Sequence, residues 1–329
     1  MSESTRAVVR LGARAVDALP PRLRRSVRAA LGRPGPRLVA PDELDAVLAR
    51  ATALMGPAPD EARALLGGIV LALPTAPPED PFSDAYRDWT WDLYRAVSGR
   101  AGYDTGHEAS PFDLAAALER PFPYQTGSLA LVGRDLVARG HLLECLADAV
   151  GAHVGPRRVV EFGPGWGNLT RDLVATGLDV TAVELDEKFC RLIEHRCDGP
   201  GRVTVELGDM LGFAATEPFD AAVFFESFHH CADHLAMLRR LHDMVRPGGV
   251  VLFAAEPIQN LDYPWGPRLD GLSVWSSRTY GWLELGFDCA YFDRALARTG
   301  WSGRRLRLGA GAGETDVIVA RAAPGHRGR

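Results

Sequence analysis

The stretch Glu161-Phe-Gly-Pro-Gly-Trp-Gly-Asn168 decides the fold. It follows the apolar run RVVEF, which is typical of a buried strand, and it precedes a segment with helical spacing. Gly163, Gly165 and Gly167 let the backbone turn sharply, and a ligand can approach their main-chain atoms because no Cβ stands in the way. The spacing G-x-G-x-G departs from the G-x-G-x-x-G of dinucleotide sites, which disfavours a nicotinamide enzyme.

From Arg158 onward, short β-rich runs alternate with helical segments, a pattern that predicts an open α/β sheet. The seven candidate strands are RVVEF, DVTAVE, VTVEL, FDAAVFF, VVLFAA, RRLRLG and TDVIVARA. The candidate helices between them run from Asn168 to Thr176, Asp186 to His195, Asp233 to Val245 and Tyr291 to Arg298.

Two acidic residues stand at the ends of neighbouring candidate strands. Glu184 closes DVTAVE, where a carboxylate can accept hydrogen bonds from both hydroxyls of a ribose. Asp209 follows the third strand, where it could accept a hydrogen bond from an adenine amino group. Each acid alone is also compatible with a solvated turn or a helix cap. Their order and spacing after the glycine turn favour a nucleoside site.

With these motifs the chain resembles the class I S-adenosylmethionine-dependent methyltransferases over about Val159 to Ala322. The resemblance also includes PFDAAVFFES and VRPGGVVLFAAEP, and it extends more loosely to polysaccharide- and sugar-associated members through W-G-x-R-L-D-G and G-W-x-E-L-G-F. It implies an α/β, Rossmann-like sheet of seven strands in the order 3-2-1-4-5-7-6, with the last strand antiparallel, preceded by an N-terminal helical region.

The resemblance implies S-adenosyl-L-methionine as the cofactor. The glycine turn would pass under its methionine part, and Glu161 would partly balance the sulfonium charge. Glu184 would hold the ribose, and Asp209 with Met210 would flank the adenine. In related enzymes a segment before the first strand closes over the cofactor. PFPYQTGS, which contains Tyr124, is the candidate for that role, although it is also compatible with an ordinary turn between helices.

The segment FFESFHHCADH follows the fourth strand, which in this family faces the transferred methyl group. We predict His229 or His230 as the general base, because histidine titrates near neutral pH, with Glu226 orienting the base or the acceptor. The histidines could also simply cap the loop and pack beside the next helix. Their spacing matches no standard zinc pattern, so no metal site is predicted. A magnesium ion shared by Glu226 and Glu256 stays open as an unsupported alternative.

An aromatic insertion at 256–288 interrupts the core and holds three of the seven tryptophans. Trp265, Trp275 and Tyr280 are interleaved with planar polar side chains, a combination that suits a hydroxylated ring. The insertion could equally be a structural flap or a dimer contact. With the sugar-associated resemblance it predicts O-methylation of a sugar hydroxyl in a glycan or glycosylated metabolite. The alternatives are N- or C-methylation of a small natural product, and a non-catalytic subunit that binds the cofactor within an assembly.

Three segments are predicted: a basic amphipathic arm at 1–40, a helical lid or substrate region at 41–155, and the methyltransferase core at 156–329. The arm carries nine arginines against two acidic residues, so the net charge of −5 is the sum of +7 in the arm and −12 elsewhere. The arm could pack on the body, or dock on an anionic membrane or an acidic partner protein.

The overall composition narrows the choice of partners. The slightly acidic balance argues against a nucleic-acid substrate, which leaves a small-molecule or glycan acceptor. Five cysteines without a C-x-x-C pair predict neither a disulfide framework nor a zinc ribbon, and free thiols suit the cytoplasm. No apolar run approaches the roughly 20 residues that cross a bilayer, and no secretory signal is evident. A homo-oligomer is compatible with the sequence.

Overall fold

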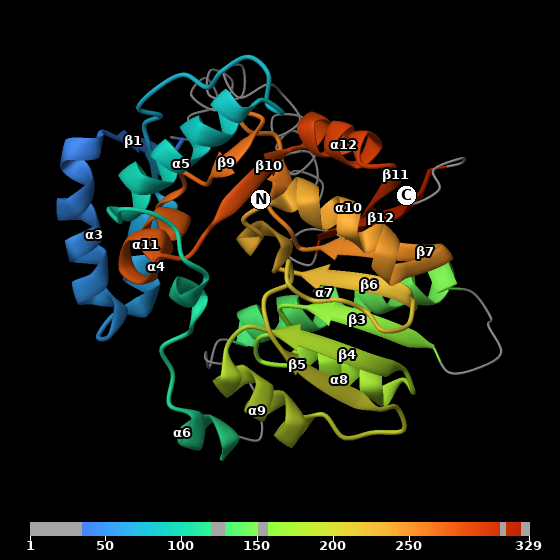
Figure 1. Cartoon of the computed structure of the whole chain (residues 1–329). Helices are drawn as coiled ribbons and strands as arrows, with labels where there is room; N and C mark the ends of the chain where they lie inside the picture. Colours follow the sequence, from blue (N-terminus) through green and yellow to red (C-terminus); the bar gives the residue numbers. More distant parts are fainter. Residues whose placement is uncertain (1–34, 120–128, 151–156, 310–313, 324–329) are drawn as a thin grey trace, which may run out of the picture. The chain divides into compact units, whose positions relative to one another are not determined.

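The computed structural model describes residues 35–119, 129–150, 157–309 and 314–323. They form two compact units. Unit 1 contains the described residues up to Tyr103 together with Ile258–Tyr291. Unit 2 contains the described residues of Asp104–Pro257 and Phe292–Arg329. Figure 1 labels most of their helices and strands.

Unit 2 is built on a seven-stranded sheet. Its strands are β3 (Arg158–Phe162), β4 (Asp179–Glu184), β5 (Val203–Leu207), β6 (Phe219–Phe225), β7 (Val245–Ala254), β11 (Trp301–Leu308) and β12 (Thr315–Ala322). Their order across the sheet is β5-β4-β3-β6-β7-β12-β11. The first five strands in this order, β5, β4, β3, β6 and β7, pair in parallel with one another. β12 is antiparallel to both of its neighbours, β7 and β11. The predicted order 3-2-1-4-5-7-6 with an antiparallel last strand is therefore confirmed. Unit 2 has the Rossmann-like fold of methyltransferases.

Helices on both faces bury this sheet. They are α7 (Leu129–Val150), α8 (Asn168–Ala175), α9 (Glu187–Arg196), α10 (His234–Met244) and α12 (Cys289–Arg298), whose first residues belong to unit 1. Leucines of α7 and α8 share one apolar cluster with β3, β4, β6, β7 and β12. The central strands are apolar on both faces because parallel strands are covered on both sides. This arrangement leaves the carboxyl ends of β3, β4 and β6 at one edge of the sheet.

The strand bounds follow the sequence pattern closely, apart from two strands that begin earlier than predicted. β7 starts at Val245 rather than at Val250, because Val245 pairs with Phe219 before an irregularity in register at Phe219–Ala221. β11 starts at Trp301, which pairs with Ala322. Unit 2 also contains the short helices η1 (Thr105–Glu108), α6 (Leu114–Leu118) and η2 (Phe228–His230).

Unit 1 joins the first part of the chain to most of the aromatic insertion. Its helices are α3 (Pro41–Met55), α4 (Pro59–Gly67), α5 (Asp84–Ser98) and α11 (Gly271–Tyr280). Its strands are β1 (Arg37–Val39) and β2 (Ile69–Leu71), which pair in parallel, and β8 (Ile258–Gln259), β9 (Trp265–Pro267) and β10 (Leu285–Asp288), which form a second sheet. The sequence analysis predicted helices for the first region, so β1 and β2 are additions to that prediction.

Two tyrosines of α5 explain why the unit boundaries differ from the three predicted segments. The hydroxyl of Tyr86 donates to the carbonyl of Trp265 at 2.9 Å, and that of Tyr94 donates to the carbonyl of Gly281 at 2.6 Å. Both side chains are buried. The insertion thus shares a core with α5, whereas residues 104–118 and α7 fold with the sheet. Residues 1–34, most of the predicted arm, lie outside the described residues. Within the described ranges no helix is both long and apolar enough to cross a membrane.

Candidate functional site

The glycine loop, residues 163–167, connects β3 to α8. Gly163, Gly165 and Gly167 all have positive φ, at 64°, 52° and 71°, a backbone region that strains other residues. A Cβ on Gly163 would come within 2.8 Å of the Ser227 side chain, and one on Gly167 within 2.8 Å of Ile193. A Cβ on Gly165 would meet nothing within 4 Å. The outer glycines therefore allow close packing, while Gly165 borders open space.

Glu184, at the end of β4, supports this loop with its carboxylate. Oε2 accepts from the Gly165 amide at 2.9 Å, and Oε1 accepts from the amides of Leu185 and Asp186 at 2.8 and 2.9 Å. Burial raises the pKa of Glu184, and the three amides oppose that rise. A carboxylate offers about four acceptor positions, so these contacts leave about one. A ribose that used both hydroxyls here would have to displace one of these three amides.

Glu161 of β3 is buried two residues before the glycine loop. Oε2 accepts from the Thr170 hydroxyl at 2.7 Å. Burial raises the pKa of Glu161 to about 8, and the charges of Glu184 and Asp172 add to the rise. The nearby guanidinium of Arg139 opposes this rise in pKa. That guanidinium is itself paired with Asp172 of α8 and with Asp135 of α7. Near neutral pH this carboxyl is therefore mostly protonated.

The end of β5 completes this side of the sheet edge. Asp209 and Met210 are half-buried in the turn after β5, and the Asp209 carboxylate accepts from the Leu211 amide at 2.9 Å. The Gly208 amide donates to the Glu184 carbonyl at 2.8 Å, which ties the ends of β4 and β5 together. The structure thus brings the predicted cofactor residues of β3, β4 and β5 to one edge. Tyr124, the remaining predicted cofactor residue, lies outside the described residues.

The base loop, residues 226–231, follows β6. It is anchored by Glu256, which the sequence analysis considered only as a magnesium ligand. The buried Glu256 carboxylate accepts from the amides of Ser227 and Phe228, both at 2.8 Å, and lies 2.8 Å from Nδ1 of His229. Burial alone would raise its pKa, but His229 and the amides outweigh burial and hold the pKa below its usual value. Glu256 is therefore ionised at neutral pH and orients His229.

Glu226, the predicted orienting residue, begins this loop with an exposed side chain and a positive φ of 52°. Ala255, after the neighbouring strand, has a φ of 56°. Non-glycine residues with such φ values are uncommon and strained, and they concentrate at functional sites. The hydrogen bond between the His229 ring and the accepting Glu256 carboxylate assigns the orienting contact to Glu256. A role for Glu226 stays a prediction.

The base loop and the glycine loop touch directly. The Ser227 hydroxyl donates to the Phe162 carbonyl at 2.6 Å, one residue before Gly163. The Cβ that Gly163 lacks would fall on Ser227. The absence of a side chain at Gly163 therefore lets Ser227 of the base loop approach the candidate cofactor loop, which no local spacing in the sequence reveals.

Residues 104–118 lie over the glycine loop and α9. Phe112 packs on Trp166 of the loop and stacks on Phe189 of α9, with ring centroids 4.9 and 4.8 Å apart. The ammonium group of Lys188, the only lysine, lies 4.7 Å from the Phe112 ring centroid and bonds the Ser110 carbonyl. The sequence analysis placed the covering segment at Tyr124. An aromatic residue upstream of the core was the only signal for Phe112.

A cavity of about 490 Å³ lies between α7 and the ends of β6, β7 and the start of β12. Its charged lining is strongly acidic. Five carboxylates face one guanidinium: Asp135, Glu226, Glu256, Glu314 and Asp316, with Arg134. Glu256 links this cavity to His229. No group of acidic, histidine or cysteine side chains among the described residues has the arrangement of a metal site.

The aromatic insertion places the three predicted substrate residues differently. Trp265 is buried, its indole N–H donates to the Pro81 carbonyl at 2.9 Å, and its ring lies against Tyr86 and Tyr291. This corrects the prediction that Trp265 faces the substrate. Trp275 and Tyr280 are partly exposed and meet edge to face at 5.5 Å. The difference follows from α5, whose aromatic face needs a buried partner.

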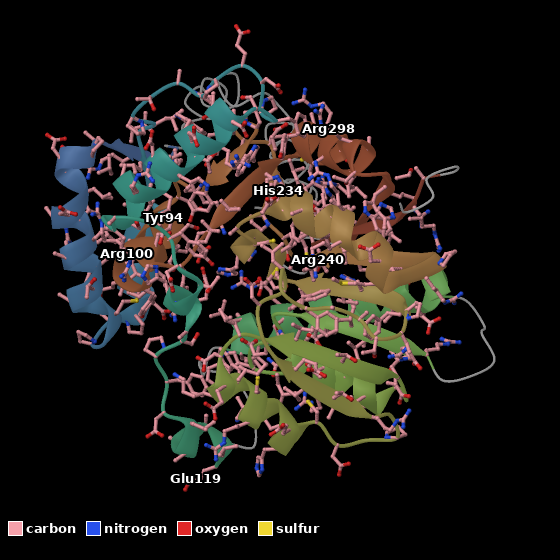
Figure 2. All side chains as sticks on the ribbon, in the orientation of Figure 1. Tyr94, Arg100, Glu119, His234, Arg240 and Arg298 are labelled. Carbon is pink, nitrogen blue, oxygen red and sulfur yellow. The ribbon has the colours of Figure 1, made fainter. Side chains whose placement is uncertain are left out.

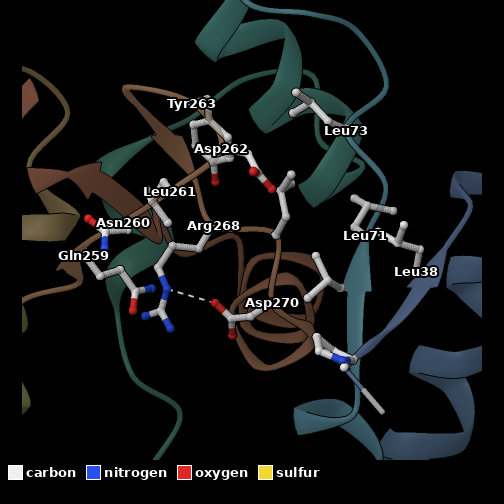
Figure 3. Close-up of a pocket in the computed structure, with 14 residues that line it drawn as sticks. Leu38, Leu71, Leu73, Gln259, Asn260, Leu261, Asp262, Tyr263, Arg268 and Asp270 are labelled. Carbon is white, nitrogen blue, oxygen red and sulfur yellow. Dashed lines mark hydrogen bonds and ion pairs between the residues drawn. The ribbon is translucent and has the colours of Figure 1, made fainter. Parts of the chain in front are cut away.

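Unit 1 also contains a cavity of about 260 Å³ that the sequence analysis missed (Figure 3). One wall is apolar and includes Leu38 and Leu71, while the other carries Gln259 and Asp262. Arg268 crosses the polar wall, and its Nε donates to Asp270 at 2.9 Å. Its lining comes from the segments around β1 and β2 and from residues 259–270, a combination that only the fold brings together.

Comparison with known proteins agrees with the fold. Residues 159–249 match a family model described as "Methyltransferase domain". An uncharacterized methyltransferase of Anoxybacillus flavithermus is 35% identical over 99 residues, which is 29% of this chain and 45% of that protein. A Synechococcus ribosomal RNA small subunit methyltransferase A is 46% identical over 56 residues, 17% of this chain and 20% of that protein. The chain spans about half or less of the curated relatives it matches.

Two solved structures are also similar to part of this chain, at low identity. A glycopeptide N-methyltransferase complexed with sinefungin has a TM-score of 0.43 and 18% identity, over 56% of this chain and 94% of that chain. A Synechocystis magnesium protoporphyrin IX methyltransferase with bound SAH has a TM-score of 0.46 and 15% identity, over 64% and 94%.

Proposed function

We propose that the chain is an S-adenosylmethionine-dependent methyltransferase that transfers a methyl group to a polar acceptor. The observation that carries this proposal is the direct contact between the glycine loop and the base loop, through Ser227 and Gly163. A methyl donor and a proton acceptor must lie side by side for in-line transfer. The match of residues 159–249 to a methyltransferase domain supports the same class.

The residues present fit the cofactor. Gly165 borders open space in which a ligand can approach the backbone, and the Glu184 carboxylate lies behind it. Asn168, at the start of α8, has a buried side-chain oxygen without a hydrogen-bond partner among the described residues. We assign the methionine part to the glycine loop, the ribose to Glu184 and the adenine to Asp209 and Met210. When bound, S-adenosyl-L-methionine supplies an electrophilic methyl group on a sulfonium.

His229 is the candidate general base. When Nδ1 carries its proton toward the ionised Glu256, Nε2 is the acceptor nitrogen of the ring. The acceptor's hydroxyl proton would move to Nε2, which would prepare the acceptor oxygen to take the methyl group that the bound cofactor would supply, with S-adenosylhomocysteine as the leaving group. Glu256 would then stabilise the resulting imidazolium, as the aspartate of a serine protease triad does.

We propose a sugar hydroxyl of a glycan or glycosylated metabolite as the acceptor. Two features of unit 1 support this choice. Trp275 and Tyr280 keep partly exposed aromatic surface that can pack on sugar C–H faces. The cavity of Figure 3 offers amide, carboxylate and guanidinium groups beside an apolar wall, which suits hydroxyls on a ring.

An amine of a small natural product is the second candidate acceptor. The cavity beside Glu256 supports it, because five carboxylates line this cavity and a negative lining stabilises a positively charged ligand. Three of them, Asp135, Glu314 and Asp316, are also paired with arginines, so the excess of negative charge is smaller than the lining alone gives. The two candidates differ in charge, so competition by protonated amines against neutral sugars separates them. A non-catalytic subunit would bind the cofactor but transfer no methyl group to either class.

Calorimetry with S-adenosylhomocysteine tests the cofactor site. Gly165→Ala should lower the affinity at least tenfold, because its Cβ would stand in the ligand's space. Gly177→Ala is the matched control, since Gly177 also has a positive φ, of 83°, and open surroundings but lies at the end of α8. Equal affinity in both variants, or no binding by the wild type, would overturn the assignment.

A further inference from the structure

The two histidines of the base loop form a pair with a second carboxylate from a distant segment. Their ring centroids are 4.2 Å apart, with 39° between the planes. Nδ1 of His229 lies 2.8 Å from Glu256, and Nδ1 of His230 lies 3.0 Å from Oε2 of Glu108. The Glu108 side chain is only 13% exposed. Each ring thus meets a carboxylate through the same nitrogen.

Local structure fixes Glu108 in this place. It ends η1, which Asp104 caps by accepting from the Gly106 amide at 2.8 Å, and the Asp104 amide donates to His107 at 3.3 Å. Two residues later, the Ser110 amide donates to Asp186 at 3.0 Å. The backbone is therefore anchored on both sides of Glu108, which fixes the position from which its carboxylate extends.

The same segment is anchored to the candidate cofactor site. Asp186 comes two residues after Glu184, and Lys188 binds the Ser110 carbonyl. Phe112 then packs on Trp166 of the glycine loop. Residues 108–112 consequently connect the ends of β3 and β4 to the base loop after β6.

We propose that Glu108 is a positioning residue for the catalytic base. Its carboxylate lies 3.0 Å from Nδ1 of His230, so its negative charge favours the imidazolium form of that ring and attracts this edge of it. The His230 ring lies against one side of the His229 ring at a tilt of 39°, while Glu256 contacts the Nδ1 edge of His229. Glu108 acts on His229 through His230 and does not itself touch the acceptor. The inference rests on the proposed role of the histidines.

The test follows histidine side chains in the full-length protein by long-range ¹H–¹⁵N spectra across pH, because it requires no acceptor. His230 should show a proton on Nδ1 in the wild type. Glu108→Gln removes a negative charge 3.0 Å from that nitrogen, so the midpoint of the His230 titration should fall by about one pH unit, and the His229 signals should shift with it. Glu119→Gln, on an exposed residue at the end of α6 (Figure 2), is the matched control.

Each outcome decides the question. An unchanged His230 titration in Glu108→Gln, even with a lower melting temperature, would mean that Glu108 only supports the fold. If Glu108→Gln fails to fold, Glu108→Asp keeps the charge but shortens the side chain, and a midpoint equal to the wild type there would also overturn the proposal. Binding of S-adenosylhomocysteine should stay within twofold in both variants. Loss of binding in the wild type would instead refute the proposed function and leave the histidine result standing.

Discussion

The glycine loop and the base loop stand at the same edge of the sheet but are built by different means. The glycine loop is shaped by its backbone: Gly163, Gly165 and Gly167 adopt positive φ, and the Glu184 carboxylate accepts from one of their amides. The base loop is held by side chains from elsewhere, since Glu256 follows β7 and Glu108 precedes the sheet altogether. The residues of the glycine loop are contiguous, so a sequence motif reveals them. The carboxylates that hold the base loop come from distant positions, so only the fold shows them.

The largest expected effect tests the base loop. Glu256→Ala would leave buried amides and the His229 ring without their carboxylate, so we expect the free energy of unfolding to fall by about 3 kcal/mol or more. Urea unfolding measures this loss, and Glu194→Ala, at an exposed position of α9, is the control. A loss equal to that of the control would mean that the loop holds itself together without Glu256.

The same variant has a distinct pH signature. The folded-state pKa of Glu256 lies below its ordinary value of 4.5, so its contribution to stability is present above that pH and is lost as the pH falls below it. We expect Glu256→Ala to lose less stability than the wild type between pH 5 and pH 3. An identical acid dependence would contradict the lowered pKa.

The second prediction concerns the glycine loop and has the opposite sign. Because burial raises the pKa of Glu161 to about 8, the folded state holds a proton that the unfolded chain releases near pH 4.5. Wild-type stability should therefore fall as the pH rises from 5 to 8. Glu161→Gln keeps the neutral shape and the bond from Thr170, so it should be more stable than the wild type at pH 8 by about 4 kcal/mol, since each pKa unit corresponds to about 1.4 kcal/mol.

The difference in the free energy of unfolding between Glu161→Gln and the wild type should shrink toward zero at pH 5. Urea unfolding at pH 5 and pH 8 measures this difference. Glu194→Gln serves as the exposed control and should follow the wild type at both. A constant offset between Glu161→Gln and the wild type would mean that Glu161 does not titrate on unfolding.

The contrast between the loops also explains what the sequence could predict. The strand order and most strand bounds followed from apolar runs and short spacings, because each depends on neighbouring residues. The same kind of spacing singled out Glu161, Glu184 and Asp209 as candidate cofactor residues, which stays a prediction. The pairing of His229 with Glu256 spans 27 positions and that of His230 with Glu108 spans more than a hundred. No periodicity records such contacts.

The prediction for Trp265 in the aromatic insertion was wrong for a related reason. Trp265 and Trp275 are not distinguished by the sequence, since both belong to the same aromatic insertion. Only the fold shows that the aromatic face of α5 covers Trp265, while Trp275 keeps an exposed edge and donates to Thr52 at 3.0 Å. Burial by a distant helix decides which aromatic side chain can meet a substrate.

A third, smaller effect concerns Glu184, whose side chain supports the glycine loop. Glu184→Gln replaces one acceptor oxygen with an amide that can only donate, opposite a loop that also donates. We expect the affinity for S-adenosylhomocysteine to fall about tenfold, with a free energy of unfolding that changes by about 1 kcal/mol. Asp198→Asn, at an exposed position after α9, should change neither. Unchanged affinity would remove Glu184 from the cofactor site.

The smallest effect tests whether the base loop stores backbone strain. Ala255 has a φ of 56°, which costs an alanine about 1 kcal/mol, whereas glycine adopts it freely but loses about half that amount in backbone entropy. Ala255→Gly should therefore stabilise the fold by about 0.5 kcal/mol. Ala236→Gly in α10 should destabilise it by about 1 kcal/mol, because glycine is a poor helix former. The two substitutions remove the same methyl group, so a shared sign in thermal unfolding would show that Ala255 is not strained. Opposite signs would show that the strand end beside Glu256 is kept in a costly conformation, as functional loops often are.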